Sequence, residues 1–376
     1  MRLGMSGSIR ARGLASWELR VYSGTNPDTG KRRYRTATVV GNRGDAERGL
    51  AELVASVRSE QSVGSSSTVS ELLEAWFVVA SGSWAPTTIR QTRSAVDRYL
   101  HPQLGAFRVG ELTPSVIDAA YVRLRVSGGG RGQGLSAGTL ARVHVVLRSA
   151  LAQAQRWGWV FDNPVERAHR IKVRKTERQP PTPDEVATLI EWLAEHDALL
   201  HLFVAIAVST GARRAQLLAL RWDNIDLSRG RVAFVGGWVE GPNGPVLSDT
   251  KTSRRHQVQV DHVTLALLAK RGENRRSGYL FSDDDGATAW KPNRATKSFL
   301  RALDSAGLRR FRLHDLRHFM ATELLQAGVA LAVVSQRLDH QRKSTTLDFY
   351  AHAVPSGDGH AADVMRSIID NARGAA

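Results

Sequence analysis

Six side chains suited to phosphate chemistry follow one another in the second half of the 376-residue sequence. In chain order they are Arg213, Lys251, His314, Arg317, His340 and Tyr350. Two guanidinium groups can bind the non-bridging oxygens of a phosphate bidentately, and a lysine can protonate a departing oxygen. A tyrosine hydroxyl becomes a nucleophile where cations stabilise its oxyanion and a base accepts its proton. Together these groups predict phosphoryl transfer without a metal ion.

Each of these residues also has an ordinary structural interpretation when it is taken alone. Arg213 opens an expected helix after the turn "STG", where free backbone N–H groups favour an anion, yet arginines are common at helix ends. Lys251 lies in "SDTKTSRRHQV", an expected tight turn between strands, where a lysine is normally solvated. Tyr350 follows Leu347 by about one turn, which is also typical of a tyrosine packed in a core. Only the combination favours a reaction.

The stretch "RLHDLRHFMATELLQAG" predicts a helix that ends at Gly328. His314 and Arg317 are three apart and share one face. The expected buried face consists of Leu316, Phe319, Met320 and Leu324. An HxxxH metal site through His314 and His318 would need a third ligand, and the sequence offers none nearby, so we expect no metal and no cofactor.

Composition points to a polyanionic partner. The 52 Lys and Arg residues outnumber 36 Asp and Glu, giving a formal net charge of +16, and nucleic acid is the commonest partner of such a protein. An Arg-rich proteome is the other explanation of this charge. Zero cysteines exclude disulfides, thiolate nucleophiles and cysteine zinc sites. No apolar stretch reaches membrane-spanning length and the start lacks a signal-peptide core, so we expect an intracellular protein.

Patterning divides the chain into three expected domains, 1–63, 68–174 and 175–376. In the first, two alternating runs around "NPDTG" predict a β-hairpin, followed by a helix in "GDAERGLAELVASVRS". Its basic cluster could bind DNA or be a solvated edge strand, and it consists of Lys31, Arg32, Arg33 and Arg35.

The second expected domain is helical, opens on a capping box at Thr68 and Glu71, and carries exposed arginines. Those arginines, taken as candidate DNA contacts, are Arg90, Arg93 and Arg142. The third opens on a capping box at Thr182 and Glu185 and is mostly helical. Two strands, "GRVAFVGGWV" and "SDTKTSRRHQVQV" around "EGPNGP", interrupt its helices.

The segments "TGARRAQLLALRW", "TKTSRR", "HDLRHFMATELLQAG" and "RLDHQRKSTTLDFYAH" resemble the signature boxes of the tyrosine recombinase (phage integrase) family, in the family's order and spacing. The resemblance implies a multidomain, mainly α fold. Its parts would be a small β-rich N-terminal arm-site DNA-binding module, a helical (SAM-like) core-binding domain, and a mixed α+β, mostly helical catalytic domain with a C-terminal tail helix. It also implies a site-specific recombinase that integrates and excises a phage or another mobile element.

The resemblance assigns a role to each of the six residues. Tyr350 would attack a DNA phosphodiester and form a 3′-phosphotyrosyl link, while Lys251 protonates the freed 5′-oxygen. The remaining four would act on the phosphorane and the tyrosine proton: Arg213, Arg317 and His340 stabilise charge, and His314 accepts the proton. Two positions depart from the family. Asp339 stands where a glycine is usual and Gln216 where an acid is usual. Asp339 could tune His340 or bond a nearby backbone group.

The expected partners are double-stranded DNA, at core and arm sites, and further copies of the chain in a tetramer on DNA. A host DNA-bending factor and an excision factor could assist, and the site of action would be the cytoplasm of a bacterial host. The tail "AADVMRSIIDNARG" could pack on a neighbouring protomer or on its own domain. The alternative function is a catalytically inactive, sequence-specific DNA-binding accessory protein; a type IB topoisomerase or telomere resolvase would share the chemistry.

Overall fold

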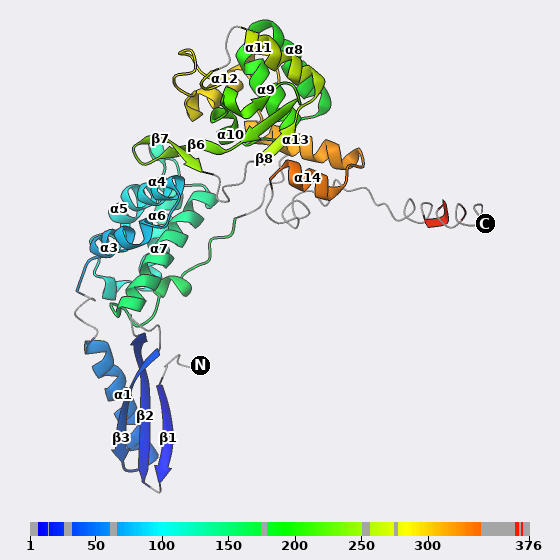
Figure 1. Cartoon of the computed structure of the whole chain (residues 1–376). Coiled ribbons are helices and arrows are strands. Elements are labelled where there is room, and N and C mark those ends of the chain that lie inside the picture. Colours follow the sequence, from blue (N-terminus) through cyan, green and yellow to red (C-terminus); the bar gives the residue numbers. More distant parts are fainter. Residues whose placement is uncertain are drawn as a thin grey trace. The chain divides into compact units, whose positions relative to one another are not determined.

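The computed structural model describes residues 7–13, 15–25, 32–60, 66–173, 179–249, 256–273, 277–339, 365–367 and 370. As the sequence predicts, the fold is mainly helical with small antiparallel sheets (Figure 1). The chain divides into two compact units, Met1–Thr176 and Glu177–Ala376. Lys251, His340 and Tyr350 lie outside the described residues. Within the described part, no helix is both long and apolar enough to cross a membrane.

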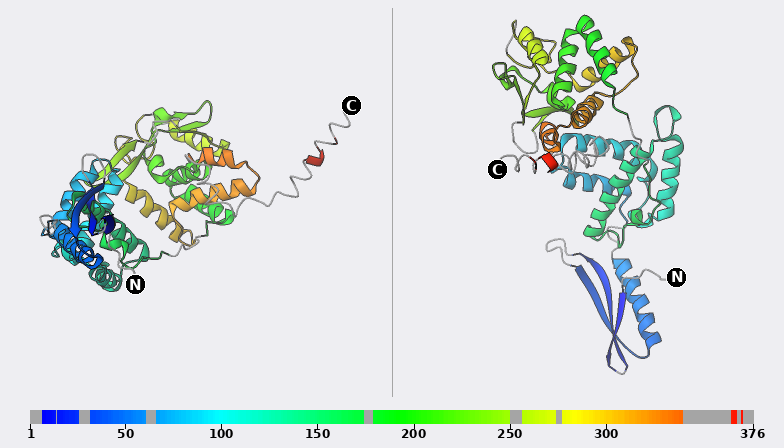
Figure 2. Two further views of the ribbon diagram at one scale, coloured as in Figure 1. Left: turned by 90° about the horizontal axis from the view of Figure 1, so that it is seen from below. Right: turned by 90° about the vertical axis from the view of Figure 1, so that its right-hand side faces the viewer.

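The first unit begins with a three-stranded antiparallel sheet covered on one face by a helix (Figure 2). Its elements are β1 (Gly7–Gly13), β2 (Ser16–Thr25), β3 (Arg32–Val40) and α1 (Arg43–Glu60). The hairpin and the helix were predicted, whereas β1 was not, because "GSIRARG" has a single large apolar residue. Leu19 and Val21 of β2 are buried against α1, which makes a small hydrophobic core for this module.

The rest of the first unit is helical, with α3 (Val69–Ser81), α4 (Pro86–Ala95), η1 (Val96–Leu100), α5 (His101–Leu104), η2 (Val109–Glu111), α6 (Pro114–Ser127), η3 (Gly130–Gly132), α7 (Ala137–Trp157) and η4 (Pro164–Glu166). The predicted capping box is confirmed: the Glu71 N–H donates to Thr68 Oγ1 at 3.2 Å, and the Thr68 N–H donates to Glu71 Oε2 at 2.7 Å. Apolar residues spaced three and four apart on α7 are buried in one continuous core with those of α3 and α6.

The helices of the second unit are α8 (Pro183–His196), α9 (Ala198–Thr210), α10 (Arg214–Leu218), η5 (Trp222–Asn224), α11 (His262–Glu273), α12 (Pro292–Ser305), α13 (Leu313–Gln326) and α14 (Leu331–Arg337). α9 is apolar on nearly all sides and contacts α8, α11, α12 and α13, which makes it the centre of the core. α14 packs on α13 through Val334 and Leu338, which contact a cluster that includes Met320 and Leu325.

The strands of the second unit correct the prediction. We expected one strand over 230–239, but the chain changes sheets at Val235 between β5 (Arg231–Phe234) and β6 (Gly236–Gly241). β6 packs closely against α10, since a Cβ on Gly237 would lie 3.1 Å from the Cβ of Ala215. The remaining strands are β4 (Ile225–Asp226), β7 (Gly244–Asp249) and β8 (His256–Gln259).

Lys251 is therefore flanked by strands of two different sheets. Among the described residues, β7 pairs with β6, and β8 pairs with β5. The tight turn that we expect around Lys251 falls within residues 250–255, which lie outside the described part.

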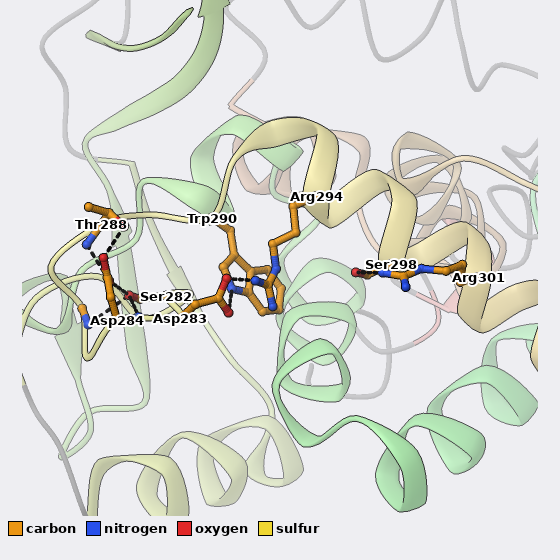
Figure 3. A network of polar contacts seen from close by, with 9 residues as sticks. Ser282, Asp283, Asp284, Thr288, Trp290, Arg294, Ser298 and Arg301 are labelled. Carbon is orange, nitrogen blue, oxygen red and sulfur yellow. Dashed lines mark hydrogen bonds and ion pairs between the residues drawn. The ribbon is translucent and has the colours of Figure 1, made fainter.

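The segment before α12 is fixed by polar contacts (Figure 3). The Trp290 Nε1–H donates to Asp283 Oδ1 at 2.9 Å, Arg294 forms an ion pair with Asp283, and the Arg294 guanidinium lies 4.4 Å from the Trp290 ring centroid. The Thr288 N–H donates to Asp284 Oδ1 at 2.8 Å. These contacts attach the loop to the first turn of α12.

Candidate active site

Arg213 lies where the sequence predicted, at the start of a helix. α9 ends at Gly211, whose φ of +67° is left-handed, and a Cβ there would overlap the Met320 side chain of α13. Arg213 is the exposed N-cap of α10, and its N–H donates to Gln216 Oε1 at 2.9 Å. Gln216, only 7% exposed, thus caps α10 as an acid would, without placing a negative charge beside Arg213.

Arg317 connects two of the signature segments, those that contain Arg213 and His340, by donating to backbone carbonyl groups. Its Nη1 donates to Gly211 O at 2.6 Å, and its Nη2 donates to Leu338 O at the end of α14. We expected Arg317 on the polar face with His314, but it is only 4% exposed because the turn at Gly211 and the end of α14 cover that side of α13. Charged donors to carbonyl groups make strong hydrogen bonds, and they leave the positive charge in place.

His314 lies in the first turn of α13, beside other positive groups. Partial burial of the imidazole lowers the pKa of His314 to about 4, and the neighbouring His318, Arg317 and Arg312 lower it further than burial alone. The rings of His314 and His318 meet edge to face, with their centroids 4.8 Å apart. His314 as a whole residue is exposed to solvent, and its lowered pKa keeps the imidazole neutral near pH 7, so it can accept a proton.

Asp339 adopts a backbone conformation that glycine adopts more readily than other residues. Its φ is +52°, in the left-handed region, directly after the C-cap Leu338 of α14. Aspartate tolerates this region better than most residues that carry a Cβ. The Asp339 N–H donates to Gln336 O at 3.0 Å, so the backbone closes the helix in a tight turn.

His256 lies near Arg213, Arg317 and Asp339, and it was not among the site residues predicted from the sequence. It is the first residue of β8, its ring meets Phe234 edge to face at 6.2 Å, and its Nδ1 is buried with no hydrogen-bond partner among the described residues. Burial lowers the pKa of His256; Asp339 opposes this shift, while Arg317 and Arg213 add to it. The one sequence signal was a histidine that opens the strand after Lys251.

One group of acidic and histidine side chains among the described residues has ligand atoms close enough to share an ion, and it lies in the first unit. Among the described residues, the acid and histidine groups with ligand atoms within 4.8 Å of one another are Glu74, Asp97 and His101 in the first unit. There Arg93 donates to both carboxylates, at 2.6 and 2.8 Å to Glu74 and 3.3 Å to Asp97. The Arg93 guanidinium bridges these two acids.

The candidate DNA contacts in the helical part of the first unit fall into two groups. Arg93 is held by carboxylates and lies 4.3 Å from the Phe77 ring centroid; its hydrogen bond to Glu74 raises the pKa of Arg93. Arg90 is exposed on α4. Arg142 is exposed on α7 and donates to the neutral amide of Gln91, so it keeps its charge. Arg90 and Arg142 therefore offer a net positive charge to a phosphate, whereas Arg93 does not.

The basic cluster of the N-terminal module is divided between the two faces of its sheet. Arg32 and Arg35 are exposed, and the alternation of β3 places them on opposite faces. Lys31 lies outside the described residues, as does the side chain of Arg33. Tyr34 is exposed on the same face as Arg32 and stacks with Arg20, whose guanidinium lies 3.8 Å from the ring centroid.

Two family descriptions match the chain, and they match it in two separate regions. "Phage integrase family" covers residues 181–356, and "Phage integrase, N-terminal SAM-like domain" covers residues 68–124.

Curated relatives are integrases and recombinases. The ICEBs1 integrase of Bacillus subtilis (strain 168) is 26% identical over 219 residues, covering 55% of this chain and 59% of the relative. A XerC-like tyrosine recombinase of Caldanaerobacter subterraneus is 23% identical over 335 residues, covering 80% and 83%. The integrase of Salmonella phage P22 is 28% identical over 242 residues, covering 60% and 56%. The match thus spans less than two thirds of the length of the first and third relatives.

Solved structures share the fold. A Tn1549 transposon integrase in complex with a circular intermediate DNA superposes with a TM-score of 0.68 at 17% identity, over 80% of this chain and 99% of that chain. A lambda integrase dimer bound to a COC′ core site gives 0.62 at 17%, over 93% and 96%. A lambda integrase tetramer bound to a Holliday junction gives 0.61 at 17%, over 93% and 96%. Both family matches and these relatives identify the matched regions, residues 68–124 and 181–356, as domains of the phage integrase family.

Proposed function

We propose that the chain is an integrase that cuts and rejoins DNA at specific sites, with six catalytic residues: Arg213, Lys251, His314, Arg317, His340 and Tyr350. The observation that carries the proposal is the pair of hydrogen bonds from Arg317. These bonds join the turn before Arg213 to the end of α14, two residues before His340. They bring together segments more than 100 residues apart in the sequence, around a group of cations suited to a phosphate.

The chemistry follows from the groups and balances without an added reactant. The Tyr350 oxygen attacks phosphorus as its proton passes to neutral His314, and the bond from phosphorus to the 5′-oxygen breaks. Lys251 gives a proton to the freed 5′-oxygen, while Arg213, Arg317 and His340 stabilise the charge on the non-bridging oxygens. A 5′-hydroxyl of a partner strand then attacks the phosphotyrosine and restores a phosphodiester. The covalent link conserves the bond energy, so no nucleotide cofactor is required.

DNA contact would be shared among three domains, 1–63, 68–174 and 175–376. The net charge of +16 supports duplex DNA as the partner, and the exposed Arg90 and Arg142 support core-site contact by the helical domain. The basic sheet face with Arg32 supports arm-site contact, since a β-ribbon fits the major groove. Deleting residues 1–63 should abolish arm-site binding and preserve core-site cleavage; arm-site binding that survives the deletion would contradict this assignment.

The assembly on DNA would be a homotetramer that joins two duplexes, with the tail after Tyr350 packing on a neighbouring protomer. The lambda integrase tetramer on a Holliday junction supports this proposal by shared fold. A host bending factor and an excision factor would control direction. The substrate would be the attachment DNA of a phage or another mobile element, which places the reaction in the cytoplasm of a bacterial host.

The test uses a nicked duplex of the core site, read from the DNA that flanks the gene. The wild type should form a covalent protein–DNA adduct, and Tyr350→Phe should bind the same duplex with unchanged affinity and form none. An adduct that persists in Tyr350→Phe would disprove the nucleophile. A wild type that binds without forming an adduct would instead identify the accessory-protein alternative. Relaxation of supercoiled plasmids that lack the site would identify a topoisomerase.

A further inference from the structure

Arg337, the last residue of α14, makes hydrogen bonds to two other segments of the chain. Its Nε donates to Ser209 O at 3.1 Å, and its Nη2 donates to the same oxygen and to Gln259 O at 2.8 Å. One planar guanidinium therefore binds the end of α9 and the end of β8 together.

The Ser209 carbonyl oxygen needs a hydrogen-bond donor from outside its own helix. In a continuing helix it would accept from the N–H four residues later, but the Arg213 N–H donates to Gln216 instead. The C-terminal end of a helix also carries partial negative charge, which favours a guanidinium there. Ser209 is a second point of attachment as well, since the Asp261 N–H, just after β8, donates to Ser209 Oγ at 3.2 Å.

Burial and charge around Arg337 suit a fixed structural donor. The side chain is half-buried, burial lowers the pKa of Arg337, and the carboxylate of Asp261 opposes this shift. An arginine stays protonated in such a place, so all of its N–H donors remain available.

Each of the three segments that Arg337 joins is next to one proposed catalytic residue in the sequence. The end of α9 precedes Arg213, β8 follows the segment that contains Lys251, and Arg337 itself lies three residues before His340. Arg317 joins α9 and α14 at neighbouring carbonyls, those of Gly211 and Leu338. Arg337 adds a hydrogen bond to Gln259 O of β8, the strand that follows the segment with Lys251.

We propose that Arg337 is a positioning residue for DNA cleavage, which holds the end of α14 against α9 and β8 so that Arg213, Lys251 and His340 meet one phosphate. This role rests on the proposed function. A lysine keeps the charge and most of the stem, but its single ammonium lacks the planar fork that reaches two carbonyls. Misplacement by about 1 Å can lower a catalytic rate about 10²-fold without loss of binding.

The experiment compares Arg337→Lys with Arg309→Lys. Arg309 is a matched control in the same unit: its guanidinium also donates to a backbone carbonyl, Pro180 O at 2.8 Å, and to Glu185, and it leads to no proposed catalytic residue. We would measure the single-turnover rate of adduct formation at saturating nicked core-site duplex, the DNA concentration at half saturation, and the melting temperature.

Arg337→Lys should lower the rate about 10- to 100-fold and leave the half-saturating DNA concentration within about twofold, with a melting temperature similar to that of Arg309→Lys. Arg337→Met should lower the rate further; if it does not fold, the lysine variant decides. An unchanged rate in Arg337→Lys would overturn the proposal. So would a rate loss matched by equal losses of affinity and melting temperature, which would indicate general destabilisation. A wild type that forms no adduct overturns the proposed function itself, and this role with it.

Discussion

Arg93 is half-buried and Arg317 is buried, and the two arginines have different hydrogen-bond partners. Arg93 in the first unit lies between the carboxylates of Glu74 and Asp97, which neutralise it. Arg317 in the second unit donates to two backbone carbonyls, which orient it and leave its full charge. A carboxylate partner offsets the charge of an arginine, whereas a carbonyl partner orients the arginine and leaves its charge available to an anion.

The largest effect should come from Arg317→Lys. This change keeps the charge but removes the planar fork that binds Gly211 O and Leu338 O and orients the cation toward the phosphate, so the single-turnover cleavage rate should fall about 10²- to 10³-fold. Arg93→Lys should leave that rate unchanged. A loss of less than about tenfold in Arg317→Lys would place Arg317 with Arg93, as a residue that stabilises only the fold.

Gly211→Ala should be next in size, because it disturbs the carbonyl that holds Arg317. The substitution strains a φ of +67° and forces Met320 to move, so the free energy of unfolding should fall by about 2 kcal/mol, and cleavage should slow. Gly328→Ala is the control for the backbone alone: its φ is +82° and nothing lies within 4 Å. If urea unfolding showed equal losses of unfolding free energy in the two variants, the contact with Met320 would not contribute to the effect of Gly211→Ala.

Arg142 and Arg93 in the first unit should differ in their effect on the salt dependence of DNA binding. Arg142→Ala should weaken core-site binding and reduce the salt slope by about 1, as expected for one lost phosphate contact. Arg93→Ala should leave the slope unchanged and lower the free energy of unfolding by about 1 kcal/mol, discounted for an ion pair that is partly exposed. If Arg93→Ala reduced the slope as much as Arg142→Ala, carboxylate pairing would not exclude DNA contact.

Substitutions of Asp339 test whether this residue acts through its backbone conformation or through its charge. Asp339→Ala should lower the free energy of unfolding by about 1 kcal/mol relative to Asp339→Gly, because alanine tolerates a φ of +52° less well. Both changes remove the carboxylate, so both should lower the pKa of His256 by similar amounts, measurable by NMR titration. A pKa that is the same as in the wild type would mean that Asp339 does not act on His256.

The last prediction concerns the dependence of stability on pH. The pKa of His314 is about 4 in the folded protein against 6.5 for an ordinary histidine, so between these values the unfolded state binds a proton that the folded state does not. Stability should therefore fall as pH is lowered from about 6.5 to 4, and His314→Gln should flatten this part of the profile. Arg317→Met should raise the pKa of His314 only partly, since burial is the larger cause. Melting curves at several pH values and NMR titration measure the two effects.

Features that depend on near neighbours were readable from the sequence. The capping boxes at Thr68 and Thr182 form because Glu71 and Glu185 lie three residues later, within reach along one helical turn. Arg213 at the start of α10 and Gly211 at the end of α9 follow from the same local rules. The spacing of apolar positions likewise predicted α7 and α13.

The sequence by itself thus determined the family boxes, the caps and most helices, while the tertiary structure decided which partner each arginine meets. Arg317 bonds to a carbonyl 106 residues away, and Arg337 bonds to one 128 residues away. Neither the burial of Arg317, nor the change of sheet at Val235, nor the place of His256 beside Asp339 has a local signal. Hydrogen bonds and packing over such distances depend on how the helices and strands dock, and no pattern of residues three or four apart contains that information.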